Sequence, residues 1–172
     1  MSSALLTPTG PATHSSPVTF REPTVDDGGE LWRIARDSET LDVNASYSYL
    51  LWCRDFASTS ILAEVDGRPG GFVTGYTRPE TPDTLMVWQV AVDDDHRGRG
   101  IARSMLEELV DRIPDVRWLE TTITDDNAAS IGLFTKFADG RDAEVTRSEL
   151  FTTDHFPDNH DPERLYRIGR LD

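Results

Sequence analysis

The feature that most constrains the fold is the stretch 85–102, LMVWQVAVDDDHRGRGIA, in which an apolar run leads through an acidic turn to alternating arginines and glycines. The apolar run predicts a buried strand, and the amphipathic segment 100–112 behind it predicts a helix. The first N–H groups of a helix lack intrahelical partners, and glycines let a ligand approach the backbone closely. With the added arginine charges, the segment 97–102 predicts a pyrophosphate-binding turn.

Two common phosphate loops do not fit this turn. No Gly-Lys-Ser/Thr run of a Walker loop occurs, and Arg103 stands where the dinucleotide fingerprint needs its last glycine. The letters RGRGIA instead match the R/Q-x-x-G-x-G/A signature of the GCN5-related N-acetyltransferases, which the chain therefore resembles. A solvated basic helix start is the alternative. In that superfamily the turn binds the pyrophosphate of acetyl-CoA, which implies this role for Arg97, Gly98, Arg99, Gly100, Ile101 and Ala102.

The composition is strongly acidic. The chain has 31 Asp and Glu residues against 17 Lys and Arg, a net charge of −14 and a pI near 4.6. Nucleic acids and anionic membrane surfaces are bound by clustered basic residues, so we expect neither as a partner. The acidity suits a small cationic substrate, and it equally suits solubility or adaptation to high salt.

Cysteine content and hydropathy bear on the compartment. The single cysteine, Cys53, excludes an internal disulfide and leaves no cysteine cluster for a metal. Its apolar neighbours favour a buried side chain over a nucleophile. No apolar run reaches the ~18 residues of a membrane span, and the N-terminus lacks the regions of a signal peptide. We therefore expect a cytoplasmic protein without a bound metal.

The chain is expected to form one domain over 18–172, preceded by a disordered tail over 1–17 that is rich in Ser, Thr, Pro and Ala. Segment 78–83 breaks the pattern, and a strand, helix and strand over 85–123 predict a parallel crossover unit. The fold class is therefore α/β with a mixed sheet. Strands are expected at 18–21, 60–65, 71–77, 85–92, 117–123, 143–151 and 165–170, and helices at 26–36, 47–56, 100–112 and 126–137.

The superfamily resemblance implies a mostly antiparallel central sheet with one parallel, splayed strand pair and flanking helices. It also implies a bulge in the strand that precedes the phosphate turn. The pantetheine arm enters the splay, which places it along Val90 and Val92, and the Val90 N–H polarises the thioester carbonyl. Asn127 matches the second CoA-side motif, although it equally suits a helix N-cap. Phe134 and Lys136 fall near the thiol end of the cofactor.

Phe134 departs from the family pattern, because many relatives have a tyrosine there that protonates the leaving thiolate. The role then passes to water, to the amine proton itself, or to another tyrosine or histidine. Because of this departure, a non-catalytic acyl-CoA-binding module is an alternative function for the chain.

Four segments carry a closer resemblance, to the L-2,4-diaminobutyrate acetyltransferases of ectoine biosynthesis. It implies transfer of acetyl to the γ-amine of diaminobutyrate, giving N4-acetyl-2,4-diaminobutyrate, in an enzyme that is commonly a homodimer. The alternatives are acetylation of another small polyamine or of a protein N-terminus. The segments are LDVNASYSYLLWC (41–53), GFVTGY (71–76), WQVAV with RGRGIA (88–102) and LETTITDDNAAS (119–130), and HDPE at 160–163 fits as well.

Several residues suit a substrate with two amines and a carboxylate. Asp42 is expected to hold an ammonium or to cap the next helix, and Trp88 to offer a face to the cation or to pack in the core. Because side chains alternate along a strand, Trp88 and Gln89 face the substrate together only across a bulge. Tyr47 and Tyr49 are expected to add hydrogen bonds.

Glu120 is a further candidate, because an unpaired carboxylate inside the neutral strand LETT is costly, unless it lies at an edge or faces solvent. Thr122 on the same strand is also a candidate substrate-binding residue. His160 and Glu163 are three residues apart near the chain end, where one is expected to take the amine proton and the other to orient it. An exposed polar loop is the alternative for this pair.

Overall fold

The computed structural model describes residues 17–39, 41 and 43–171 and contains one seven-stranded sheet in the order β1-β2-β3-β4-β5-β7-β6. Neighbouring strands are antiparallel except β4 and β5, which are parallel. The predicted fold class is confirmed. The strands are β1 (Val18–Arg21), β2 (Ile61–Val65), β3 (Arg68–Arg78), β4 (Thr81–Val92), β5 (Trp118–Ile123), β6 (Glu144–Phe151) and β7 (Glu163–Gly169), and the α-helices are α1 (Gly28–Asp37), α2 (Ser46–Asp55), α3 (Ile101–Arg112) and α4 (Ala128–Gly140).

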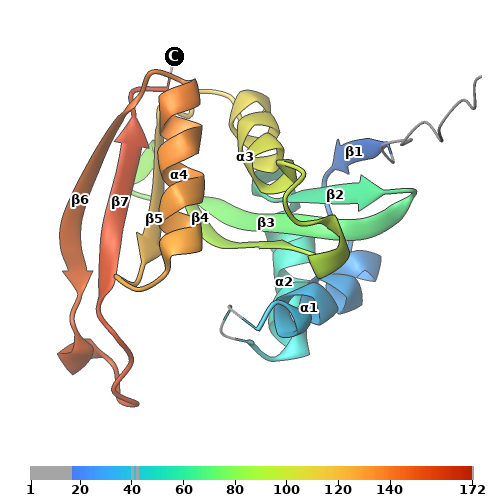
Figure 1. The fold of residues 1–172 in the computed structure, drawn as a ribbon, viewed down its shortest axis with the longest axis horizontal. Coiled ribbons are helices and arrows are strands. Elements are labelled where there is room, and N and C mark those ends of the chain that lie inside the picture. Colours follow the sequence, from blue (N-terminus) through green and yellow to red (C-terminus); the bar gives the residue numbers. More distant parts are fainter. Residues whose placement is uncertain (1–16, 40, 42, 172) are drawn as a thin grey trace, which may run out of the picture.

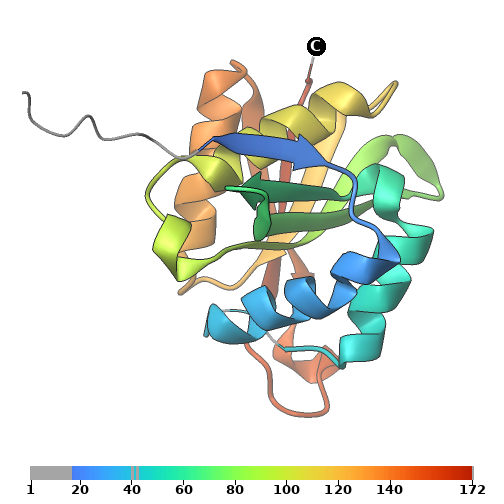
Figure 2. The same ribbon diagram turned by 90° about the vertical axis from the view of Figure 1, so that its right-hand side faces the viewer.

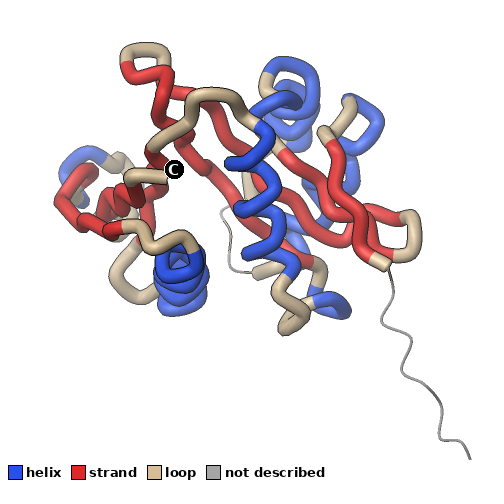
Figure 3. Tube along the Cα trace, turned by 90° about the horizontal axis from the view of Figure 1, so that it is seen from above, coloured by secondary structure: helices blue, strands red, loops and turns tan. Residues whose placement is uncertain are grey.

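The four helices form two layers around a strongly twisted sheet, so that in Figure 1 β6 and β7 run nearly upright while β2 and β3 run across the view. Helices lie on both faces of the sheet (Figures 2 and 3). One core packs α3 and α4 against one face, around residues such as Leu85 and Met105. A second, smaller core packs α1 and α2 against the other face, around Tyr49 and Phe72.

The break predicted over 78–83 is shorter in the structure, because β3 continues to Arg78 and β4 begins at Thr81. Pro79 lies in the turn between them. Pro82 lies inside β4, where the pairing with β3 is irregular between Thr77 and Arg78. A proline, which has no N–H to donate, is tolerated at such an irregularity.

Strand β4 contains a bulge at Trp88. Thr74 of β3 pairs with Gln89 and the next residue, Gly75, pairs with Val87, so Trp88 is an extra residue on β4. The bulge inverts the alternation of side chains: Val87 packs in the α3–α4 core and Ala91 in the α1–α2 core. Trp88 and Gln89 therefore face the same side of the sheet. This is the arrangement that both residues need in order to face the substrate together.

The parallel strands separate beyond this point. Pairing between β4 and β5 ends at Val87 and Thr121. Beyond it, β4 stays paired with β3 as far as Val92, and β5 stays paired with β7 as far as Ile123. The strand pair is splayed, as expected, and the gap opens toward the N-terminus of α3.

Residues 1–16, which make up most of the predicted tail, lie outside the described residues. Within the described part of the chain, no helix has the length and apolar character needed to cross a membrane.

Candidate active site

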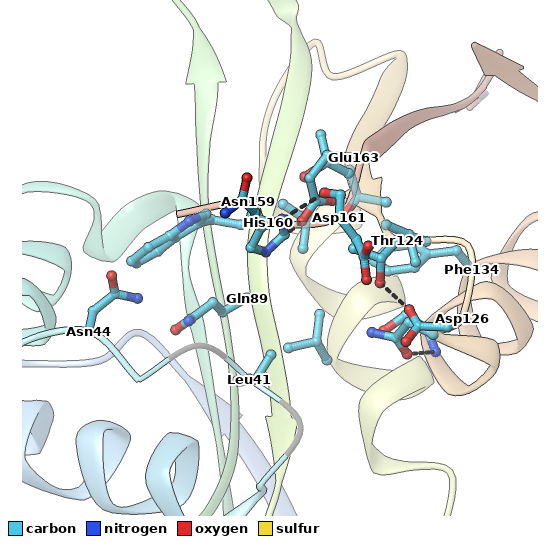
Figure 4. A pocket seen from close by; sticks show the side chains of 18 residues that line it. Leu41, Asn44, Gln89, Thr124, Asp126, Phe134, Asn159, His160, Asp161 and Glu163 are labelled. Atoms are coloured by element: carbon cyan, nitrogen blue, oxygen red, sulfur yellow. Dashed lines mark hydrogen bonds and ion pairs between the residues drawn. The ribbon is translucent and has the colours of Figure 1, made fainter. Parts of the chain in front are cut away.

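A cavity of about 560 Å³ occupies the gap between β4 and β5 (Figure 4). The two diverging strands form its walls, and α4, the segment before α2 and the segment before β7 complete it. Eighteen residues line it: Leu41, Asn44, Val87, Trp88, Gln89, Val90, Thr121, Thr122, Ile123, Thr124, Asp126, Asn127, Ser130, Phe134, Asn159, His160, Asp161 and Glu163.

The charged groups of the cavity are acidic. Asp126, Asp161 and Glu163 line it, and no lysine or arginine is among the described lining residues. In Figure 4 these carboxylates lie on the α4 side, whereas the amides of Asn44 and Gln89 lie on the opposite side, toward α2. A concave site with this charge favours a cation.

His160 and Glu163, which the sequence proposed as a pair, both line the cavity. The distance from His160 Nε2 to Glu163 Oε1 is 3.9 Å. His160 Nδ1 lies 2.7 Å from the carbonyl oxygen of Asp161, and the ring packs on Phe156 with centroids 4.6 Å apart. Because a carbonyl only accepts hydrogen bonds, Nδ1 carries the proton, and the neutral ring has its basic lone pair on Nε2.

The side chain of Gln89 is hydrogen-bonded to a residue of α2. It is 5% exposed, and its Oε1 accepts a hydrogen bond of 3.1 Å from the hydroxyl of Tyr49, which is fully buried. Burial raises the pKa of Tyr49, which also hydrogen-bonds Asn44. Tyr49 does not line the cavity, but it is hydrogen-bonded to two residues that do, Gln89 and Asn44.

Trp88 lines the cavity and contributes an aromatic ring to it. Its ring stacks on Trp52 of α2 with centroids 4.8 Å apart and an interplanar angle of 19°. Trp88 remains 38% exposed, so it is not a core residue. Since the face of an indole attracts cations, this position suits the ammonium of a substrate.

Two more of the predicted substrate residues do not line the cavity. Tyr47 is 66% exposed on α2 and does not line the cavity. Glu120 is buried and also does not line it, and its carboxylate is not unpaired as the sequence predicted. Its carboxylate is compensated by Arg78 at 3.1 Å and Arg167 at 3.7 Å. Asp42 lies outside the described residues, whereas Thr122 lines the cavity.

The predicted pyrophosphate turn lies on the surface between β4 and α3. Gly98 and Gly100 have φ of 74° and 76°, a conformation that favours glycine. A Cβ at either position meets nothing within 4 Å, so the turn is open on its outer side. Helix α3 begins at Ile101, its N-cap is Gly100, and no side chain caps its first N–H groups. These groups fit an anion.

Arg97 and Arg99 are both exposed in this turn. The Arg97 guanidinium lies 2.8 Å from Asp94 and donates to the carbonyl oxygens of Ser38 and Val92, each at 3.3 Å. Arg97 therefore ties the turn to the end of β4 and to the end of α1.

The predicted cofactor residues of α4 and β4 divide into two groups. Asn127 both lines the cavity and caps α4, accepting from the Ser130 N–H at 3.0 Å. Val90 and the buried Phe134 line the cavity as well. Val92 and Lys136 do not, and Lys136 is exposed.

Sequence reasoning missed part of the lining, notably Asn44, Asn159 and Asp161. These residues belong to or adjoin the segments LDVN and HDPE that were singled out. Nothing in one sequence indicates which of their polar side chains turn inward. Within the described residues no group of three or more His, Cys, Asp or Glu side chains is arranged to hold a metal ion.

Comparison with known proteins adds a family and a set of relatives. The model of the acetyltransferase (GNAT) family matches residues 28–138. An L-2,4-diaminobutyric acid acetyltransferase of Streptomyces coelicolor is 59% identical over 154 residues, 87% of this chain and 91% of the relative. The enzyme of the same name from Marinococcus halophilus is 46% identical, over 88% of this chain and 90% of its own length.

Solved structures of acetyltransferases resemble the chain in fold. A diaminobutyrate acetyltransferase from Paenibacillus lautus, solved with its substrate L-2,4-diaminobutyric acid and coenzyme A, superposes with a TM-score of 0.87 at 37% identity. The match covers 91% of this chain and 97% of that one. An Ard1 protein from Thermoplasma volcanium, at 18% identity and a TM-score of 0.72, shares the fold.

Proposed function

The chain belongs to the acetyltransferase (GNAT) family, and on this premise we propose that it transfers the acetyl group of acetyl-CoA to the γ-amine of L-2,4-diaminobutyrate. The product is N4-acetyl-L-2,4-diaminobutyrate, a precursor in ectoine biosynthesis. One observation carries the proposal: an acidic cavity with a His160–Glu163 pair lies in the strand splay of an acetyltransferase fold. Relatives at 46% and 59% identity are named for this activity.

Acetyl-CoA supplies an acyl thioester when it is bound. Its pyrophosphate suits the N–H groups between Gly98 and Ala102, where the open outer side of both glycines leaves room. Arg97 and Arg99 add positive charge there. The acylated arm suits the gap between β4 and β5, beside Val90, with the Val90 N–H directed to the thioester carbonyl.

The attacking amine has to lose a proton. With an ordinary amine pKa of ~10.4, deprotonation at pH 7 costs about 4–5 kcal/mol. His160 Nε2 accepts this proton, because Nδ1–H is held by the Asp161 carbonyl oxygen. Glu163 stabilises the resulting imidazolium and attracts the ammonium before it reacts.

The leaving thiolate also needs a proton, and Phe134 provides none. The hydroxyl of Tyr49 is hydrogen-bonded to Gln89 and does not line the cavity. The proton that His160 Nε2 has taken from the amine is therefore the one returned to the sulfur in this proposal.

The oligomeric state and compartment belong to the same proposal. We place the enzyme in the cytoplasm as a homodimer without nucleic-acid or membrane partners, and the net charge of −14 supports the last two points. Large apolar side chains are exposed on α2 and on β6, among them Leu50 and Phe151. Light scattering during gel filtration measures the mass, and a single 19.3 kDa species would refute the dimer.

The direct test is turnover. The protein is incubated with acetyl-CoA and L-2,4-diaminobutyrate, thiol release is followed, and NMR locates the acetyl group on the product. We expect one thiol per acetyl group and acetylation at N4. Tight binding of acetyl-CoA without thiol release would instead identify a non-catalytic acyl-CoA-binding module, and faster turnover of a peptide or of another polyamine would replace the substrate.

A further inference from the structure

The connection between β6 and β7 carries several of the polar groups of the cavity. Asn159, His160 and Asp161 lie on it, and Glu163 is the first residue of β7. The connection extends beyond the sheet (Figure 1), and β6, which leads into it, is exposed along its whole length. Loops of this kind are generally more mobile than the strands that they join. A proton acceptor placed on such a loop therefore needs contacts that fix its ring.

A row of four aromatic rings runs along this connection. The His160 imidazole packs on the Phe156 ring with centroids 4.6 Å apart and an interplanar angle of 33°. Phe156 meets Phe151, the last residue of β6, edge to face with centroids 6.3 Å apart. Phe151 also meets His155 edge to face, at 6.1 Å. Aromatic rings at these separations attract one another, so the row links His160 to the end of β6.

Hydrogen bonds within the connection fold it so that these rings meet. The N–H of His155 donates to the carbonyl oxygen of Thr152, and the N–H of Phe156 donates to that of Thr153, each at 3.0 Å. In return, His155 Nδ1 accepts from the Thr152 N–H at 2.9 Å. This arrangement is a capping box with a histidine at its third helical position. The turn that carries Phe156 is thus closed by hydrogen bonds in both directions.

Two contacts act on the His160 ring in different directions. Nδ1 lies 2.7 Å from the carbonyl oxygen of Asp161, which sets the edge of the ring that faces the backbone. Phe156 packs on one face of the ring, which restricts the tilt of its plane. Together they direct Nε2, which lies 3.9 Å from Glu163 Oε1. Phe156 itself does not line the cavity, so its effect on the chemistry passes through His160.

We propose that Phe156 is a positioning residue for the acetyl transfer, and that its ring holds the His160 imidazole with Nε2 directed to the γ-amine. The inference rests on the proposed function, because it concerns the proton acceptor of the same reaction. Phe156 touches neither substrate. The orientation of Nε2 matters for proton transfer and not for binding of diaminobutyrate, so loss of the ring lowers kcat and leaves KM nearly unchanged.

The experiment compares F156L with F156Y. Leucine keeps an apolar side chain but has no ring face, whereas tyrosine keeps the ring. We expect F156L to lower kcat about tenfold, with KM for both substrates within about twofold of wild type, since small misplacements of a catalytic group have effects of this order. F156Y keeps at least about half the wild-type kcat. F20L is the matched control, because Phe20 is also half-buried but lies on β1 at the opposite edge of the sheet and outside the cavity lining, and its kcat is unchanged.

A double-mutant cycle with H160Q separates positioning from a general structural role. If Phe156 acts through His160, F156L has less than about a twofold effect on kcat in the H160Q background. A second tenfold loss in that background, a wild-type kcat in folded F156L, or an F156Y as slow as F156L overturns the proposal. Circular dichroism and calorimetry with coenzyme A show whether each variant is folded, and F156M takes the place of F156L if F156L is not.

Failure of the proposed function looks different. In that case the wild-type protein releases no thiol with diaminobutyrate, and NMR tests the ring contact alone. The ring current of Phe156 shifts the ring-proton signals of His160, which are assigned by their loss in H160Q. These signals move in F156L and stay at their wild-type positions in F20L. Unchanged His160 signals in F156L refute the positioning role.

Discussion

Replacing Gly75 by alanine tests whether the bulge in β4 builds the substrate wall. Gly75 is the β3 residue paired beside the extra residue Trp88. A Cβ at this position lies 2.8 Å from the backbone oxygen of Met86 and 3.2 Å from that of Thr59. Both contacts are with backbone, which cannot rotate away, so β3 and β4 have to move apart at the bulge.

Overpacking of this kind costs about 1–3 kcal/mol, which for a domain of this size lowers Tm by roughly 3–10 °C. Calorimetric melting measures that loss, and steady-state kinetics measures the accompanying rise in KM for diaminobutyrate as Trp88 and Gln89 shift. G29A is the control, because Gly29 is exposed at the start of α1 and a Cβ there meets nothing within 4 Å. It is expected to be neutral or to stabilise by up to about 1 kcal/mol. Wild-type Tm and KM in G75A would refute the reasoning.

Three further outcomes are expected. H160Q lowers kcat by about 10²–10⁴-fold, whereas a wild-type kcat in H160Q argues against Nε2 as the base. G100V, with a β-branched side chain at φ 76° beside the α3 N–H groups, weakens CoA by at least about tenfold in calorimetry. The hydrogen bond from Arg21, and to a smaller extent the hydrogen bonds from Thr24, lower the pKa of Asp27 from 3.8 to about 2, although burial opposes this shift. The stability from Asp27 is thus present above pH 4 and lost as the pH falls toward 2. It amounts to about 2 kcal/mol at most, because Arg21 is partly exposed. Acid titration of wild type and D27N measures it, and equal slopes would contradict it.

The parts of the fold that local patterns encode were predictable. The apolar stripe of the helix over 100–112 includes Met105, Leu106 and Leu109, and all three are fully buried in the structure. The parallel pair followed from a strand, helix and strand in sequence, because the crossing helix returns the chain to the end of the sheet where the first strand began. The positive φ angles at Gly98 and Gly100 likewise agree with a glycine turn before a helix.

Features that depend on remote partners were not predictable. The bulge at Trp88 is a one-residue shift in pairing with β3, so the residues of β4 alone do not specify it, and only the family resemblance implied a bulge in this strand. The ion pairs of Glu120 come from Arg78 on β3 and Arg167 on β7, 42 residues away in the first case. Tyr49 looked like a direct contact to substrate, and only the packing of α2 on the sheet places it behind Gln89.

The most direct test of the account is a crystal structure of the protein with coenzyme A and L-2,4-diaminobutyrate. The account predicts the pyrophosphate on the N–H groups of 98–102, the thiol arm in the β4–β5 gap beside Val90, and the γ-amine facing His160 Nε2. Coenzyme A bound outside the gap, or diaminobutyrate with its γ-amine directed away from His160, would contradict it.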